Sequence, residues 1–187
     1  MKSELKRHLL PLLVIFIIIS IYWIINKNAW YQFISLFCGL VGGSLLLDID
    51  HLIYWLYLNP NIEESRLAQI AFKKRDFRSL IKLLEITHHK HTNLIFHHFF
   101  FQVVLAAISV FVFTSSGNVF GMGLMLALNI HLLIDEIVDY RRDPHHLQDW
   151  LFAREEKQLP LRLLSKYIGV FIVFTFVFFF LLLKSKT

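Results

Sequence analysis

The chain has 187 residues, of which 56% are hydrophobic and 18% are charged, and its formal net charge is +5. Soluble domains are about 45–50% apolar and about 25% charged, so the mean hydropathy of +0.56 excludes a disordered chain and disfavours an ordinary soluble protein. The single cysteine, Cys38, excludes an internal disulfide. The hydropathy therefore points to a membrane protein rather than to a nucleic-acid-binding protein, and no nucleic-acid partner is expected.

Five apolar segments are long enough, or nearly so, to cross a bilayer as helices. A span needs about 20 apolar residues, because every backbone polar group in lipid must be satisfied within its own segment. The first segment ends in Tyr22-Trp23 without a cleavage site of small residues, which predicts a retained anchor rather than a signal peptide. The sequence predicts an all-α integral membrane protein, a single polytopic domain over residues 1–187, with spans at about 9–25, 29–50, 94–114, 119–138 and 163–183.

Lys and Arg are distributed unevenly between the two sides of these spans. Sixteen of the 19 lie before the first span, between the second and third, or in the segment from Asp139 to Lys166, which includes the start of the fifth span. Lys27, Lys184 and Lys186 lie on the other side. Because Lys and Arg accumulate in cytoplasmic loops, we expect a multi-pass protein of the cell (inner) membrane, with the N-terminus in the cytoplasm and the C-terminus outside.

Residues 60–93 are predicted to form amphipathic helices on the cytoplasmic side. Apolar residues recur there at helical spacing, at Phe77, Leu80, Ile81 and Leu84. Such a helix suits an anionic membrane surface, and it equally suits packing against the protein. Arg78, Lys82 and Lys90 are candidates for attracting an anionic headgroup, so membrane lipids are predicted partners.

Ionisable residues inside spans are rare and costly, and here they gather at the ends of three spans. The second span ends in Asp48-Ile49-Asp50-His51, the third begins at His97-His98, and the fourth contains His131, Asp135 and Glu136. In the predicted orientation all three groups lie near the inner membrane face. Gly42 and Gly43 precede the first group and allow close approach of helices, as small residues do in membranes.

The spacing of these residues predicts a metal site. His131 and Asp135 are four residues apart, and Asp48 and His51 are three apart, so each pair shares a helix face and can hold one ion. Asp50 points elsewhere, which leaves it as a ligand of a second ion, a residue that orients a ligand, or a general base. Mixed imidazole and carboxylate ligands favour Zn or Mn over Mg. The predicted ligands are Asp48, His51, His97, His131 and Asp135, with His91, His98 and Glu136 as further candidates; a structural hydrogen-bond network is the alternative.

Two segments resemble motifs of the YdjM-like membrane-bound metal-dependent hydrolases. Residues 43–51, Gly-Ser-Leu-Leu-Leu-Asp-Ile-Asp-His, are similar to the aspartate-rich segment of that family, with Leu47 where the family has proline. His131-Leu-Leu-Ile-Asp135 resembles its later H-x-x-x-D segment. The histidine box of the family is not intact, and His91 or His97 takes its place, with His97 at the matching depth. The resemblance covers about residues 38–139 and implies metal-dependent hydrolysis of a phosphoester or lipid-type substrate.

The leading functional prediction is a metal-dependent hydrolase of the cytoplasmic membrane face that acts on an amphipathic (phospho)ester. In this prediction a divalent metal is held by the ligands above, and Asp50 is the general base. The sequence is also compatible with two alternative functions. An ion or proton relay would use the same buried groups, although no chain of polar residues crosses the outer halves of the spans. A non-catalytic membrane scaffold with a structural metal is the other.

Overall fold

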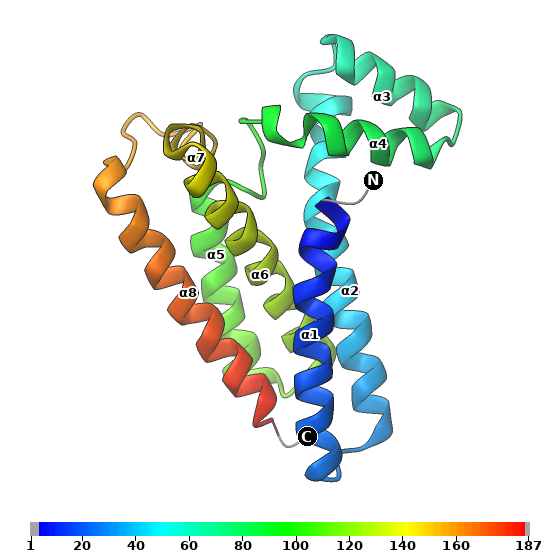
Figure 1. Cartoon of the computed structure of the whole chain (residues 1–187), viewed down its shortest axis with the longest axis vertical. Coiled ribbons are helices and arrows are strands. Elements are labelled where there is room, and N and C mark those ends of the chain that lie inside the picture. Colours follow the sequence, from blue (N-terminus) through cyan, green and yellow to red (C-terminus); the bar gives the residue numbers. More distant parts are fainter. Residues whose placement is uncertain (1–3, 186–187) are drawn as a thin grey trace.

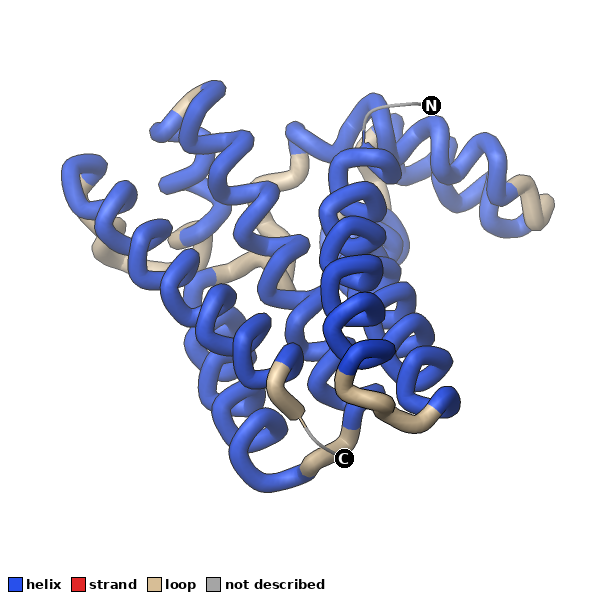
Figure 2. Tube along the Cα trace, turned by 60° about the horizontal axis from the view of Figure 1, so that its bottom comes forward, coloured by secondary structure: helices blue, strands red, loops and turns tan. Residues whose placement is uncertain are grey.

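The computed structural model describes residues 4–185, and the chain within that range is helical, without strands (Figure 2). Eight α-helices are joined by short loops and by three further helical turns, η1 to η3. Their bounds are α1 Glu4–Ile25, α2 Trp30–Ile53, η1 Tyr54–Leu58, α3 Glu63–Lys73, α4 Phe77–Thr87, η2 His88–Lys90, α5 Phe99–Phe111, η3 Val112–Ser116, α6 Val119–Arg142, α7 Pro144–Leu151 and α8 Leu161–Leu183.

Four helical segments are long and apolar enough to cross a membrane: Lys6–Ile25, Trp30–Leu58, Val119–Arg142 and Leu161–Leu183. A fifth, Phe99–Ser115, is apolar but shorter. The prediction of an all-α membrane protein is confirmed. The third span is shorter than expected, because the chain before Phe99 is not helical. His98 caps α5 in an extended conformation and accepts a hydrogen bond from the Phe100 amide at 3.2 Å.

The long helices run up and down beside one another, so that the connections alternate between two ends (Figure 1). The hairpin of α3 and α4, the beginning of α1 and helix α7 all lie at one end. The short connections from α1 to α2 and from η3 to α6 lie at the opposite end, with the end of α8. This alternation agrees with the expected order of loops. Which end faces the cytoplasm stays a prediction from charge, to which Lys2 and Lys186 contribute from outside the described residues.

Helices α2 and α6 form the closest pair in the bundle, and glycines make their approach possible. A Cβ on Gly39 would lie 2.4 Å from the Phe120 carbonyl oxygen, and one on Gly43 would lie 2.5 Å from that of Leu124. Gly42 faces open space by comparison, with its nearest neighbour at 4.0 Å. The expectation for Gly43 thus agrees with the structure, whereas its partner in the contact is Gly39 and not Gly42, because residues four apart share one helix face.

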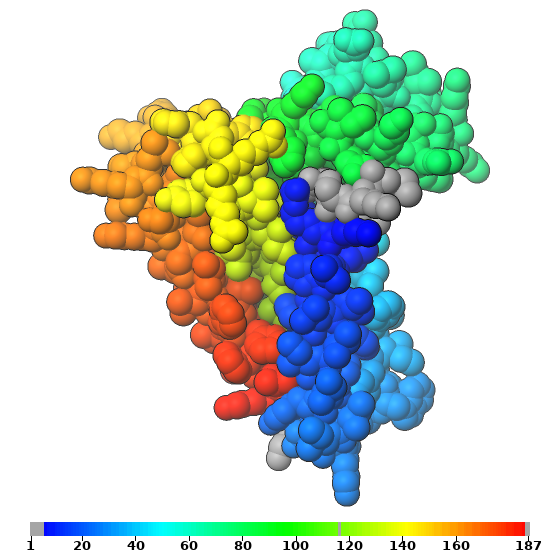
Figure 3. Space-filling model, viewed as in Figure 1, coloured from blue at the N-terminus to red at the C-terminus, as the bar shows by residue number. Residues whose placement is uncertain are grey.

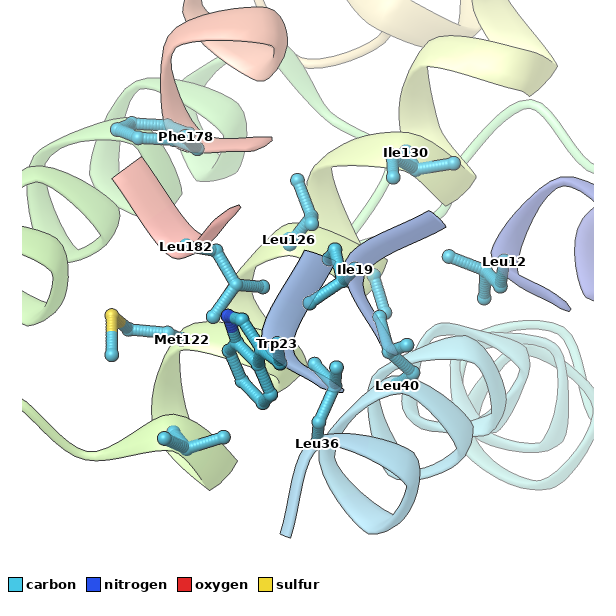
Figure 4. Close-up of a cluster of buried hydrophobic side chains, with 12 residues drawn as sticks. Leu12, Ile19, Trp23, Leu36, Leu40, Met122, Leu126, Ile130, Phe178 and Leu182 are labelled. Atoms are coloured by element: carbon cyan, nitrogen blue, oxygen red, sulfur yellow. The ribbon is translucent and has the colours of Figure 1, made fainter. Parts of the chain in front are cut away.

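The core of the bundle lies toward the end opposite the hairpin, where four helices meet (Figure 4). It is apolar and includes Trp23 and Leu36, both fully buried. Trp23 donates its indole N–H to the Leu183 carbonyl oxygen at 3.1 Å, which joins the ends of α1 and α8. This packing leaves the polar ends of the helices gathered at the hairpin end.

The α3–α4 hairpin lies at the end of the molecule where α2 ends (Figure 1), and it forms the top of the view in Figure 3. Trp55, in the π-helical turn η1, is buried against Ala68, Ala71 and Leu80 of the hairpin. Asp76 begins α4 by accepting the Ser79 amide at 3.1 Å, as an N-cap does. Exposed apolar side chains remain on both hairpin helices, at Leu67, Ile70, Phe72, Phe77, Ile81 and Ile86. This amphipathic surface agrees with the helices expected within residues 60–93.

Candidate metal centre

Imidazole and carboxylate side chains from five parts of the chain meet at the hairpin end of the bundle. They come from α1, from the end of α2, from the turn η2, from the segment before α5 and from α6. Two groups of three residues place one ligand atom each within 4.8 Å of one another. The first group is His8, His131 and Asp135, and the second is His51, His88 and His97. Five of these six side chains are at least nine-tenths buried; His88 is partly exposed.

The first group surrounds the Asp135 carboxylate. Oδ1 of Asp135 lies 3.3 Å from Nε2 of His8, and its Oδ2 lies 3.4 Å from Nε2 of His131. Nδ1 of His131 lies 3.0 Å from the Ser44 carbonyl oxygen. Since a carbonyl oxygen only accepts, Nδ1 carries the hydrogen and Nε2 keeps its lone pair. That Nε2 atom is buried without a hydrogen-bond partner, which is the state of a metal-binding nitrogen.

The second group is held through His97, which contacts two carboxylates. Nδ1 of His97 donates to Oδ2 of Asp50 at 3.2 Å, and Nε2 lies 3.6 Å from Oδ2 of Asp135. Burial lowers the pKa of His97, but its interactions with Asp135 and Asp50 outweigh burial and raise that pKa to about 9. These carboxylates therefore hold a positive charge at this position, and a metal cation is a chemical substitute for that proton.

A chain of hydrogen bonds orients His51. Nε2 of His91 lies 2.9 Å from Oε1 of Glu64, and Nδ1 of His91 lies 2.6 Å from Nδ1 of His51. When His91 donates to the carboxylate, its bare Nδ1 accepts from His51, and Nε2 of His51 keeps its lone pair. Burial lowers the pKa of His91 to about 4, partly opposed by Asp50, so His91 is neutral at pH 7, as this chain requires. Nε2 of His51 is buried without a hydrogen-bond partner.

Asp50 is fully buried, and both of its oxygens already accept hydrogen bonds. Oδ1 accepts the Ile95 amide at 3.0 Å, and Oδ2 accepts the Phe96 amide at 2.6 Å as well as Nδ1 of His97. These bonds pin the non-helical segment before α5 against α2. The arrangement does not favour Asp50 as a general base, because its side chain is fully buried and both of its oxygens already hold the segment before α5 in place.

The remaining candidates from the sequence occupy different positions. Asp48 lies at the rim, where its side chain is 30% exposed and Oδ1 is 3.8 Å from Nε2 of His131, so it does not join His51 in one group as its spacing predicted. His98 caps α5, His91 orients His51, and Glu136 is buried outside both groups. The basic residues Arg78, Lys82 and Lys90 are exposed on the hairpin and the turn after it.

Two residues of the groups were missed from the sequence. His8 lies two residues after Lys6, in the basic start of the first span, and the charge pattern already placed that start at the depth of the other polar clusters. Its ring stacks on that of His131, with 3.8 Å between centroids. His88 lies in a polar histidine tract that is typical of a solvated loop, and only the turn after α4 directs it toward His51, with ring centroids 4.5 Å apart. No local pattern distinguishes it from His89.

A cavity of about 400 Å³ opens beside the first group, between α1, α2 and α4. Its polar lining residues are His8, Ser44, Asp48, Glu85 and His88. Apolar side chains of α2 and α4 form most of the remaining wall: Leu45, Ile49, Leu52, Phe77, Leu80, Ile81 and Leu84. A cavity of this size accommodates a small organic molecule, and its lining suits one with a polar end and a hydrocarbon part.

Comparisons with known proteins give no support from relatives: no family model, no curated protein and no solved structure matches this chain. The resemblance to the YdjM-like hydrolases therefore rests on the two motifs in α2 and α6. Functional assignment depends on the chemistry of the two groups of ligands and of the cavity beside them.

Proposed function

We propose that this chain is a metal-dependent hydrolase that acts at the cytoplasmic membrane border on an amphipathic ester, with phosphoesters as the preferred class. The observation that carries the proposal is the state of His51, His97 and His131. Each is buried, each is anchored through Nδ1, and each has an Nε2 atom without a hydrogen-bond partner. Burying three such nitrogens is costly unless they bind something.

The residues that would hold the catalytic ion are His8, His131 and Asp135. Two imidazoles with one carboxylate favour Zn or Mn over Mg, which prefers oxygen ligands and retained water. Three protein ligands leave a coordination position open, as in catalytic metal sites. When bound, such an ion lowers the pKa of water and polarises the oxygen of an ester.

The chain supplies the remaining functions around that ion. Asp48 faces the cavity and is partly exposed, so we assign it, in place of Asp50, as the base that takes a proton from the attacking water. Asp50 positions His97 through the hydrogen bonds described above. The apolar wall of the cavity would receive the hydrocarbon part of the substrate, and the exposed Arg78, Lys82 and Lys90 would attract an anionic membrane-bound substrate through their field.

The experiment combines metal analysis with a screen for hydrolysis. The full chain is purified in detergent without chelators, loaded with Zn²⁺ or Mn²⁺, and assayed with phospholipids and simple phosphoesters. Asp48→Asn should keep its metal and lose turnover by a factor of about 10²–10⁴, the usual effect of losing a general base. Asp149→Asn, an exposed carboxylate on α7, should match the wild type. A metal-loaded wild type that turns over none of these compounds would refute the proposal.

The alternatives from the sequence predict different outcomes. An ion relay would give metal or proton flux in proteoliposomes that is sensitive to Asp135→Asn, without product. A scaffold would give neither flux nor product, while keeping its metal. The relay finds little support in the fold, because the buried ionisable side chains among the described residues gather at the hairpin end. The buried polar side chains farther along the bundle, such as Gln32 and Thr175, are uncharged.

A further inference from the structure

We propose that the chain binds a second divalent transition-metal ion between His51, His88 and His97, beside the ion that the proposed function places between His8, His131 and Asp135. The inference rests on the proposed function for the first ion. It adds a site made of imidazoles alone, in which only His51 belongs to one of the two motif segments. His88 in particular belongs to neither of the two motif segments.

The ligand atoms of the second site are grouped and oriented so that they can bind one metal ion. Ligand atoms of all three histidines lie within 4.8 Å of one another. His51 and His97 each use Nδ1 in a hydrogen bond, so Nε2 is the ligand atom that each can offer. At His97 a bound metal ion would take the place of the proton on Nε2. Both Nε2 atoms are buried without a hydrogen-bond partner. Imidazole nitrogens grouped in this way are ligands for Zn²⁺ or Co²⁺ and poor ligands for Mg²⁺ or Ca²⁺.

The surrounding residues orient these imidazoles as outer partners do in metal sites. Glu64 fixes His91, and His91 fixes His51, while Asp50 fixes His97. Carboxylates that accept from the far nitrogen of a ligating histidine hold its ring in place and make it a better ligand. Glu64 belongs to α3, and His88 follows α4, so both helices of the hairpin contribute to this site.

Asp135 connects the two sites. Its Oδ2 lies 3.4 Å from Nε2 of His131 in the first group and 3.6 Å from Nε2 of His97 in the second. A carboxylate between two groups of imidazoles is the arrangement that lets one residue contact two ions. Pairs of ions held close together stabilise both the attacking and the leaving oxygen in phosphoester hydrolysis. The second site therefore fits the substrate class proposed for the first.

The test counts bound metal and uses two neighbouring histidines as a matched pair. His88 belongs to the group, whereas His89 lies outside it, with Nδ1 3.7 Å from Oδ1 of Asp139. Full-length protein in detergent is equilibrated with Zn²⁺ alone. We expect about two Zn²⁺ per wild-type chain, about one in His88→Ala and about two in His89→Ala. Equal zinc content in wild type and His88→Ala would overturn the second site.

A spectroscopic measurement distinguishes direct binding of the metal by residue 88 from an indirect, structural effect of the substitution on zinc content. His88→Cys and His89→Cys are made in a Cys38→Ser background and loaded with Co²⁺. Only His88→Cys should show a thiolate-to-cobalt charge-transfer band, because only that side chain joins the ligands. His88 is partly exposed, so neither substitution at this position opens the core. Absence of the band in a monodisperse, cobalt-loaded His88→Cys protein would refute the assignment.

The first ion is tested separately by His8→Ala. Loss of about one Zn²⁺ from this variant, together with loss of the other from His88→Ala, supports both sites. If His8→Ala keeps both ions while His88→Ala loses one, the second site stands and the ligand set of the proposed function is wrong.

Discussion

Replacing Gly43 by alanine should disturb both the helix pair and the first metal site. The added Cβ would lie 2.5 Å from the Leu124 carbonyl oxygen and 2.7 Å from the Ala127 Cβ, whereas ordinary contacts begin at 3.4 Å. Because packed backbone cannot compress, α2 and α6 must separate here by about 1 Å. Overpacking of this kind costs about 1–3 kcal/mol of stability.

The same displacement reaches His131 through the next residue of α2. The Ser44 carbonyl oxygen accepts from Nδ1 of His131 at 3.0 Å, and a separation of about 1 Å removes that hydrogen bond. Loss of such an orienting partner weakens metal binding by about 10–100-fold. We therefore expect Gly43→Ala to bind zinc more weakly and to unfold at a lower temperature.

Two neighbouring glycines provide the controls. Gly42→Ala meets its nearest atom, Cδ1 of Leu124, at 4.0 Å and should resemble the wild type. Gly39→Ala meets the Phe120 carbonyl oxygen at 2.4 Å, about one turn farther from the site, so it should lose stability with a smaller loss of zinc affinity. Thermal unfolding in detergent and zinc titration against a competing chelator measure both quantities. If Gly43→Ala and Gly42→Ala behave alike, close helix approach does not position His131.

Three further predictions address other parts of the molecule. Asp50→Asn should lower the free energy of unfolding, measured by thermal or denaturant unfolding, by about 1.5–3 kcal/mol, the range for hydrogen bonds to a charged group. Unchanged stability with lost turnover would instead favour the role of general base expected from the sequence. Removal of metal by a chelator should lower the unfolding temperature, and free zinc at 100 times its dissociation constant should restore about 2.7 kcal/mol of stability. An unfolding temperature that does not respond to chelator or zinc would contradict a bound metal. Topology can be tested in a Cys38→Ser background with a membrane-impermeant thiol reagent. Ser185→Cys should react only from outside intact cells, and Arg75→Cys only from the cytoplasmic side. The reverse pattern would contradict the predicted topology.

The architecture could be predicted because it follows from properties that sequence displays directly. Long apolar segments and the placement of Lys and Arg give the spans and the end at which polar residues gather. The predicted third span begins too early in the chain, because the apolar residues Leu94, Ile95 and Phe96 precede the helix, which begins at Phe99. Their backbone is drawn out of helix by Asp50, which accepts the amides of Ile95 and Phe96.

The roles of individual site residues were harder to predict, since partners far apart in the chain decide them. Asp50 and Asp48 are two residues apart, yet one is enclosed by backbone amides from beyond residue 90 and the other faces a cavity. Helical spacing predicted that Asp48 and His51 share an ion. His51 instead turns toward His91 and His88, which reach it only because the hairpin folds back over the end of α2.

The origin of the ligands in different helices has a consequence for how the protein is made. His8 belongs to the span Lys6–Ile25, which emerges during synthesis well before Val119–Arg142, the span that carries His131 and Asp135. A nascent chain in which α6 has not yet been inserted cannot bring these three residues together. Metal acquisition at the first group must then follow insertion of α6, and zinc content becomes a measure of completed assembly in the membrane.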